Sequence, residues 1–427
     1  MKKTLALIIL VVFLLSLFAG CASNGEEAAP TEQAAEGAVS TEKSPEASSG
    51  ENSGLSGEYN IGCHIILTGN NSVFGVTCVD GINLAVKYIN EHGGMNGAKV
   101  TFEAFDNQSK VEESVKLVQK FIEEDTYDAI IGSHNSADCL ATVDLLNAAE
   151  TLNFGMGTSY SFMENPDNIW TFRAALNGNR QAPMIYDLCA KLGFENIAIL
   201  NGNDDNAIAT ADAFQEAVEA GGATIVERQV CDQADTDFSG QISQIIASKP
   251  DTVFLSALGA QFGPMIKQFR NQGYTGTIST KDSMQQDFIN VAGVENCNYV
   301  YYAYPYVTYT DINDITDPYM KEFTELYIEE YGTLPNIEGS YRGWDTMMSL
   351  WEASKIAGSN DKEAIREAMD KVKIPGLGGT LDFTNGDREG YSAVSEFIMI
   401  DGKSIYVDDW LADGGYEAYL EATGNEK

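Results

Sequence analysis

Short apolar segments alternate with helix-length segments along most of this 427-residue chain, and that alternation limits the folds open to it. Residues 61–67 form an apolar run, and residues 76–89 then place apolar side chains at helical spacing. Residues 99–105 alternate apolar and polar side chains, as a half-buried strand does. Repeated strand–helix–strand units predict an α/β fold built on a doubly wound parallel sheet with helices on both faces.

The strand–helix rhythm restarts near residue 197, which predicts a second lobe of similar design. A body from Tyr59 to Lys427 is also too long for one ordinary core. Beyond Tyr306 the order changes to long helices and then strands, which indicates that the chain crosses back between lobes. Further strands are predicted at residues 129–131, 153–156, 197–200, 224–230, 253–255, 277–278, 380–383 and 396–400, and further helices at 111–122, 207–220, 238–247, 262–272, 319–331, 339–357 and 362–372.

A lipoprotein signal peptide is predicted over residues 1–20. Lys2 and Lys3 precede an apolar stretch, and two small residues then precede Cys21, the predicted site of cleavage and lipidation. Acyl chains on Cys21 would hold the protein at a membrane surface. The alternative is an uncleaved anchor with an incidental cysteine, although the apolar run is shorter than the roughly 20 residues of a spanning helix.

Residues 21–58 are predicted to form a disordered acidic tether, because Ala, Glu, Ser, Gly and Pro dominate this stretch. The whole chain has 26 Lys and Arg against 63 Asp and Glu, a formal net charge of -37. Nucleic acid binding needs a basic face, so we predict no nucleic acid partner and interpret the acidity as a source of solubility.

The sequence offers no catalytic or metal-binding motif: it has no G-x-S-x-G elbow, phosphate-binding loop or H-E-x-x-H, and only 3 histidines. Residues 376–379 are glycine-rich but follow a proline, which favours a turn, and residues 311–317 lack the pattern of a calcium loop. We therefore predict a protein without catalytic residues, cofactor or metal, with a surface enzyme as the alternative of a different class.

Six cysteines besides Cys21 are widely spaced, which fits neither a zinc site nor a dense disulfide framework. Export permits disulfides, but an even count alone does not establish pairing. We predict mostly buried, small apolar side chains at Cys63, Cys78, Cys139, Cys189, Cys231 and Cys297.

A series of short motifs follows the predicted elements in order: Leu67-Thr68-Gly69, Phe74-Gly75, Gly81-Ile82-Asn83-Leu84-Ala85, Ile89-Asn90-Glu91-His92-Gly93-Gly94, Asp106-Asn107, Ile130-Ile131-Gly132 with Ser136, and Gly339-Ser340-Tyr341. In order and spacing they resemble the substrate-binding lipoproteins of ABC importers, of the leucine/isoleucine/valine-binding (branched-chain amino acid) family. The resemblance covers residues 59–409.

The resemblance implies the type I periplasmic binding protein fold, with two Rossmann-like lobes joined by a three-crossover hinge. It also implies an extracytoplasmic monomer, lipid-anchored at the cell membrane, either in the periplasm or on the outer face of the cytoplasmic membrane. This protein would capture an amino acid, branched-chain ones included, and deliver it to an ABC permease and ATPase complex. Lobe 1 would comprise residues 59–175 and 306–388, lobe 2 residues 176–305 and 389–427, and the hinge residues near 173–177, 304–306 and 387–390.

Polar loops rich in small residues, 132–136 and 157–161, follow two predicted strands. Ligands of open α/β sheets bind outside the carboxyl ends of strands, and hydroxyls at a helix N-terminus suit a carboxylate. By resemblance, Ser136 and Ser161 bind the ligand carboxylate and Tyr160 contributes backbone contacts. Without the resemblance, each serine would be an ordinary N-cap.

The resemblance also implies that Phe74 covers the ligand and that Asp282 pairs with its ammonium. Otherwise Phe74 would be a core residue and Asp282 an exposed turn residue. Asn206, in a polar loop over residues 201–206, is predicted to bind the ligand at a position where the family commonly has an aromatic, and Arg342 is a second departure from the family. These departures leave the ligand's side chain open. Alternatives are a ligand-sensing lipoprotein that reports to a signalling partner, and a receptor for an amide, urea or carboxylate.

Overall fold

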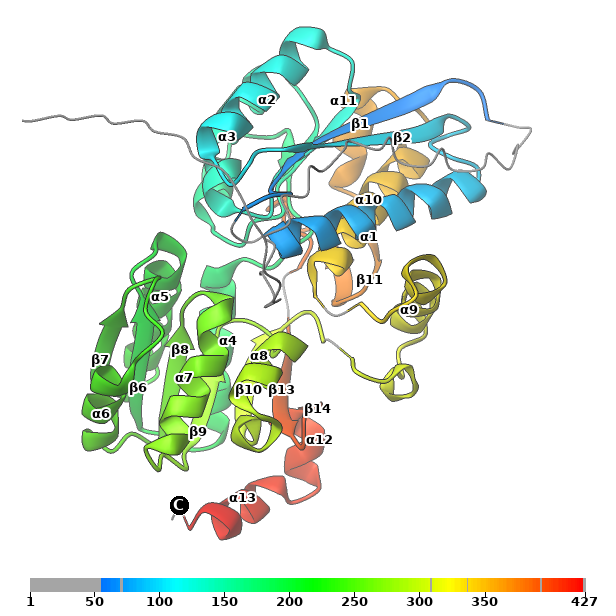
Figure 1. The fold of residues 1–427 in the computed structure, drawn as a ribbon. Coiled ribbons are helices and arrows are strands. Elements are labelled where there is room, and N and C mark those ends of the chain that lie inside the picture. The colour runs from blue at the N-terminus through cyan, green and yellow to red at the C-terminus, as the bar shows by residue number, and fades with distance from the viewer. Residues whose placement is uncertain (1–54, 70–71, 308, 336, 392–393, 425–427) are drawn as a thin grey trace, which may run out of the picture. The chain divides into compact units, whose positions relative to one another are not determined.

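The computed structural model describes residues 55–424 apart from residues 70–71, 308, 336 and 392–393. The predicted signal peptide, Cys21 and nearly all of the predicted tether lie outside the described residues, so these predictions stay predictions. Two large sheets, each with its own helices, follow one another along the chain (Figure 1).

The first sheet is parallel throughout, in the order β2-β1-β3-β4-β5. On the central strand, Ile61 lies between Phe102 on one neighbour and Ala129 on the other. A parallel strand covered on both faces needs apolar side chains on both, which explains the apolar run found in the sequence. The strands are β1 (Glu58–Ile65), β2 (Lys99–Asp106), β3 (Ala129–Ile131), β4 (Asn153–Phe154) and β5 (Thr171–Phe172).

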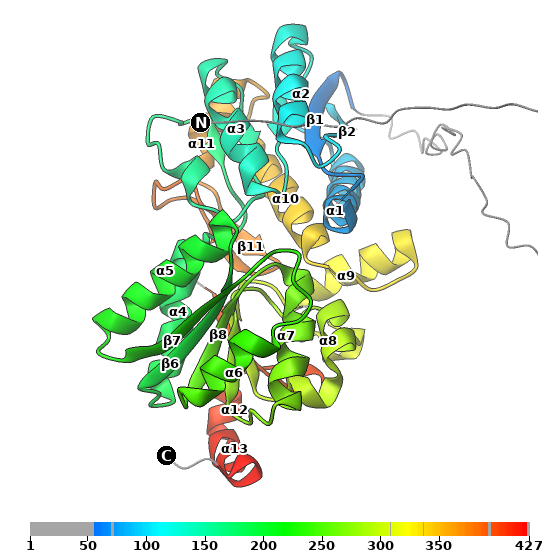
Figure 2. The ribbon, with the colours of Figure 1, turned by 60° about the vertical axis from the view of Figure 1, so that its left-hand side comes forward.

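Helices flank this sheet, and two of them, α1 and α10, pack along each other although they lie far apart in the sequence (Figures 1 and 2). The backbones approach closely because glycines face them: a Cβ at Gly81 would lie 2.0 Å from the Ser340 carbonyl oxygen. A Cβ at Gly343 would lie 2.3 Å from the Cys78 carbonyl oxygen. The helices are α1 (Ser72–Glu91), α2 (Val111–Glu124), α3 (Ser136–Ala148), α9 (Pro318–Tyr331), α10 (Gly339–Ala357) and α11 (Lys362–Met369).

By length and hydropathy, α1 is the one described helix that could span a membrane. It packs here as a core helix, because Ile82, Ala85 and Ile89 are fully buried against the first sheet and α10. The same residues carry the helical spacing seen in the sequence.

The second sheet has the order β14-β13-β10-β9-β8-β6-β7, with antiparallel pairing only at β13 and β14. Alternate residues of β6 enter different cores: Ile197 and Ile199 pack on one side, Ala198 and Leu200 on the other. The strands are β6 (Asn196–Gly202), β7 (Thr224–Cys231), β8 (Thr252–Ser256), β9 (Thr277–Thr280), β10 (Val300–Tyr304), β13 (Ser395–Ile400) and β14 (Lys403–Tyr406). The helices are α4 (Gly178–Lys191), α5 (Asp205–Ala220), α6 (Ser239–Ala247), α7 (Gly259–Asn271), α8 (Gln286–Ala292), α12 (Val407–Ala412) and α13 (Gly415–Thr423).

The chain passes between the two sheets after β5, after β10 and after a small hairpin of β11 (Lys373–Gly376) and β12 (Gly379–Asp382). Two of these passages pair with each other: Arg173 N–H donates to the Arg388 carbonyl at 3.0 Å, and Gly390 N–H donates to the Arg173 carbonyl at 2.8 Å. The buried Arg173 guanidinium also forms an ion pair with Glu389. The crossing segments are therefore held together by backbone and side-chain contacts.

The predicted α/β architecture with two parallel sheets is confirmed. All six described cysteines are buried, as predicted, and none of them forms a disulfide; residues 376–379 form the hairpin turn. One local prediction was too wide: the predicted loop over residues 201–206 is only residues 203–204, because Asn201 is buried in β6 and Asn206 lies in the first turn of α5. The lobe boundaries stay a prediction.

Candidate ligand-binding site

Two serine-containing loops meet at the carboxyl end of the first sheet. The helix α3 begins at Ser136, after β3 and the loop over residues 132–135. The loop after β4 brings the Ser159 N–H to 3.1 Å from Ser136 Oγ, which accepts its hydrogen bond. Gly157 permits this approach, since a Cβ there would lie 2.8 Å from Ser136 Cα. The sequence therefore needs a glycine here for steric reasons.

The loop after β4 extends the series of hydroxyl groups that begins at Ser136. Ser159 Oγ lies 2.9 Å from Ser161 Oγ, so Ser136, Ser159 and Ser161 form one connected series of polar groups. The Arg173 guanidinium donates to the carbonyls of Ser159 at 2.6 Å and Gly157 at 3.2 Å, which fixes the course of the loop. Tyr160 is exposed, and its carbonyl accepts from Met163 N–H at 2.8 Å within the short 3-10 turn.

A small cavity joins this loop to residues of the second sheet. Its volume is about 10 Å³, which is room for about one water molecule. Two predicted site residues, Asn206 and Asp282, line it, and Asn206 Nδ2 donates a long hydrogen bond of 3.5 Å to Thr158 Oγ1. The other lining residues are Thr158, Leu176, Gly178, Gln181, Thr210, Lys281 and Tyr304.

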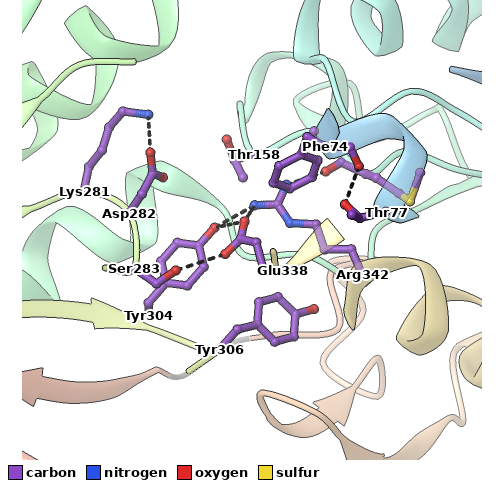
Figure 3. Close-up of polar contacts among 12 residues, drawn as sticks. Phe74, Thr77, Thr158, Lys281, Asp282, Ser283, Tyr304, Tyr306, Glu338 and Arg342 are labelled. Atoms are coloured by element: carbon purple, nitrogen blue, oxygen red, sulfur yellow. Dashed lines mark hydrogen bonds and ion pairs between the residues drawn. The ribbon is translucent and has the colours of Figure 1, made fainter. Parts of the chain in front are cut away.

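Lys281 is a cavity residue that the sequence did not reveal. Its ammonium donates to Asn206 Oδ1 at 2.8 Å and lies 3.4 Å from Asp282 Oδ2, while its side chain is only 11% exposed. Figure 3 shows Lys281 and Asp282 side by side, across from Thr158. A lysine next to an aspartate gave no signal in the sequence, because such pairs are usually solvated surface residues.

A buried cluster of charged and aromatic residues lies beside this cavity (Figure 3). The Arg342 guanidinium forms an ion pair with Glu338 and donates to Tyr304 Oη at 2.6 Å and to the Met156 carbonyl at 2.8 Å. Glu338 also accepts from Tyr304 Oη at 2.8 Å. Burial opposes the charge on Arg342, yet Glu338 and Tyr304 outweigh it and raise the pKa of the guanidinium. Arg342 therefore stays cationic.

Phe74 lies against this cluster, at the start of α1. The Arg342 guanidinium carbon is 5.1 Å from the centroid of the Phe74 ring, a cation–π distance, and the His134 ring centroid is 5.0 Å from it. Burial, together with the charge on Arg342, lowers the pKa of His134 to about 3. His134 is therefore neutral at ordinary pH, and neither ring nitrogen has a partner among the described residues.

The structure thus brings the predicted residues into two groups. Ser136 and Ser161 are linked through Ser159, and Asn206 and Asp282 share the cavity. The members not predicted are Lys281 and Glu338. Thr158 and Ser159 lie in the predicted loop 157–161 but had no assigned role, and Arg342 was noted only as a departure from the family pattern. A charged pair at positions i and i+4, Glu338 and Arg342, was the one available signal.

The sequence model of the periplasmic binding protein family matches residues 58–397 of this chain, which is most of its length. The chain belongs to the periplasmic binding protein family. A similar sequence is the amino acid binding protein of Pseudomonas aeruginosa, 22% identical over 78% of this chain and 87% of the relative. Another is Leu/Ile/Val-binding protein homolog 1 of Brucella suis, 23% identical over 81% of this chain and 92% of the relative.

Solved structures of two solute-binding proteins share the fold. The branched-chain amino acid transporter substrate binding protein LivJ of Streptococcus pneumoniae, in complex with isoleucine, gives a TM-score of 0.70 at 19% identity and covers 81% of this chain and 97% of its own. A solute binding protein of R. palustris in complex with benzoate gives 0.69 at 16% identity, with 82% and 96% covered. The predicted type I periplasmic binding protein fold is confirmed. Family and fold are those of extracytoplasmic solute-binding proteins, not of enzymes.

Proposed function

We propose that this periplasmic binding protein captures an amino acid between its two lobes and delivers it to the permease of an ABC importer. The observation that carries the proposal is the connected series Ser136, Ser159 and Ser161, whose loop reaches the cavity where Asp282 lies. Hydroxyls and backbone N–H groups at the start of α3 would bind the carboxylate. Asp282 would accept the ammonium. The names of the relatives support an amino acid ligand.

Ligand entry requires the walls of the cavity to separate, since about 10 Å³ cannot hold an amino acid. The contact between Thr158 and Asn206 is a long one of 3.5 Å, which costs little to open. Phe74 would cover the ligand from the first lobe. Contacts made to both lobes at once would then favour the closed arrangement, because only a closed cleft provides all of them.

A thermal-shift and calorimetric screen of the full-length protein tests this function, after co-purified ligand has been removed by unfolding and refolding. The panel holds the L-amino acids, their des-amino acids, short amides, urea and benzoate. Stabilisation by an amino acid, through preferential binding to the folded state, supports the proposal. A shift with benzoate or an amide alone would mean that the ligand belongs to that class instead, and no shift with any solute would contradict the proposed function.

Two variants separate the two halves of the proposed site. Ser136→Ala should weaken binding of every carboxylate ligand about tenfold, by loss of a charge-assisted hydrogen bond worth roughly 1.5 kcal/mol. Asp282→Asn should weaken amino acids but not their des-amino acids. Ser243→Ala, at an exposed position of α6, is the matched control for the first variant. Equal binding by Asp282→Asn and the wild type would place the ammonium elsewhere.

We also propose that Cys21 is the lipid-bearing residue at the start of the mature chain. The support is the sequence Phe18-Ala19-Gly20-Cys21 after a basic and then an apolar segment. Metabolic labelling with a clickable fatty acid should mark the wild type and not the Cys21→Ser variant. Labelling that persists in Cys21→Ser would contradict the assignment.

A further inference from the structure

The wall of the cavity formed by the second lobe is polar where a receptor for aliphatic amino acids would need an apolar surface. It presents the amide of Asn206, the ammonium of Lys281 and the carboxylate of Asp282, with Gln181 and Thr210 beside them. Leu176 is the one aliphatic side chain among the residues that line the cavity. An aliphatic ligand side chain placed here would remove water from these groups without giving any hydrogen bond in return, which is costly.

We propose that Lys281 sets the specificity of this site for an amino acid whose side chain ends in a carboxylate or a carboxamide. The inference rests on the proposed function, because it assigns the class of amino acid captured by the same cleft. The terminal oxygen of the ligand side chain accepts a hydrogen bond from the Lys281 ammonium. Asn206 then completes the contact by offering its amide N–H groups.

The contacts of Lys281 leave room for such an acceptor. An ammonium has three N–H donors. Among the described residues, two oxygens lie close to it, Asn206 Oδ1 at 2.8 Å and Asp282 Oδ2 at 3.4 Å, and the second is too long for a strong bond. The Lys281 side chain is only 11% exposed, so its ammonium has little access to water and gains from another oxygen partner.

The other cation near the cavity, Arg342, is already neutralised within the protein. Its ion pair with Glu338 is buried on both sides, with side chains 6% and 3% exposed, and Tyr304 and the Met156 carbonyl take further donors. Lys281 instead lies next to an aspartate that the proposed function assigns to the ligand ammonium. Once Asp282 turns to the ligand, Lys281 is the cation available to the ligand's side chain.

Isothermal titration calorimetry on the refolded full-length protein tests the inference with L-glutamate, L-glutamine and L-leucine. The wild type should bind glutamate or glutamine at least tenfold more tightly than leucine. Lys281→Met should lose at least tenfold in affinity for the preferred ligand and less than threefold for leucine. Lys267→Met, which removes an exposed lysine on α7, is the matched control and should leave all three affinities unchanged.

The wild-type comparison needs no variant, so it decides the matter even if Lys281→Met fails to fold. Leucine binding that equals or exceeds glutamate and glutamine binding would overturn the inference and leave the proposed function intact. Equal losses for all three ligands in Lys281→Met would overturn the specificity role. Failure of the wild type to bind any amino acid would overturn the inference and the proposed function together.

Discussion

The walls that the two lobes contribute to the site are built on different principles. On the first-lobe side, the polar groups are held by partners in the protein: Ser136 by Ser159, and Arg342 by Glu338. On the second-lobe side, the Lys281 ammonium contacts Asn206 and Asp282, and all three residues line the cavity. A wall fixed by its own contacts suits the carboxylate that all amino acids share, and a wall with incomplete contacts suits the ligand side chain, which varies among them.

The largest effect should come from breaking the internal ion pair of the first-lobe side. Glu338→Leu leaves the Arg342 cation buried without its carboxylate, which should cost about 3–5 kcal/mol in the free energy of unfolding. Urea unfolding measures this loss. Asp314→Leu breaks the exposed pair between Lys403 and Asp314, 2.9 Å apart, and should cost about 1 kcal/mol or less.

A double variant separates the charge from the packing. Glu338→Leu combined with Arg342→Met removes both charges, so it should recover much of the stability lost in Glu338→Leu. If Glu338→Leu lowers the free energy of unfolding no more than Asp314→Leu does, the Glu338–Arg342 ion pair does not hold the first-lobe wall in place. The proposed difference between the two walls would then be wrong.

A change in the spacing of the two serine loops should have an intermediate effect on stability and ligand affinity. Gly157→Ala places a methyl group 2.8 Å from Ser136 Cα, so the loops must move apart. We expect a stability loss of about 1–3 kcal/mol from overpacking and a loss of affinity for every carboxylate ligand. Urea unfolding and calorimetry measure the two quantities.

Gly240→Ala is the matched control for Gly157→Ala. Gly240 lies in α6, and a Cβ there would meet nothing within 4 Å. This variant should be neutral or slightly stabilising, because alanine favours a helix over glycine. Full ligand affinity in Gly157→Ala would show that the contact between Ser136 and Ser159 does not shape the site.

The sequence predicted regular elements well where their boundaries are chemically marked. Residues 129–131 and 339–357 were placed with the observed limits of β3 and α10. The strand β10 was not predicted. Val300–Tyr304 is buried on both faces, and its tyrosines give neither an alternating pattern nor an aliphatic run. Helix α4 was not predicted either, because it contains Pro183, and a proline normally ends a helix.

The site was harder to predict than the fold. Ser136 and Asp282 came from the family resemblance, and the structure places Asp282 at the cavity. Lys281 could not be found from the sequence, because its partner Asn206 lies 75 residues away and only the fold brings them together. Glu338 resembled a solvated charge, since it is buried beside Tyr304, a partner 34 residues away in the sequence.

The smallest effect concerns the neutral histidine of the first-lobe side. Burial and Arg342 lower the pKa of His134 to about 3 from the ordinary 6.5. Between these two values the unfolded chain binds the proton and the folded one does not, so stability falls as the pH falls below about 6.5. From pH 7 to pH 5.5 His134 should account for a loss of about 1 kcal/mol.

His134→Phe should therefore remove about 1 kcal/mol from the decline in the free energy of unfolding over that range, measured by urea unfolding at each pH. Phenylalanine keeps the ring contact with Phe74, so the packing of the site should survive. His92→Phe, at an exposed position, is the control and should leave the decline unchanged. A decline in His134→Phe equal to that of the wild type would mean that the ring takes up its proton in the folded state. The first-lobe wall would then change its charge with pH, and the contrast with the charged wall around Lys281 would hold only at neutral pH.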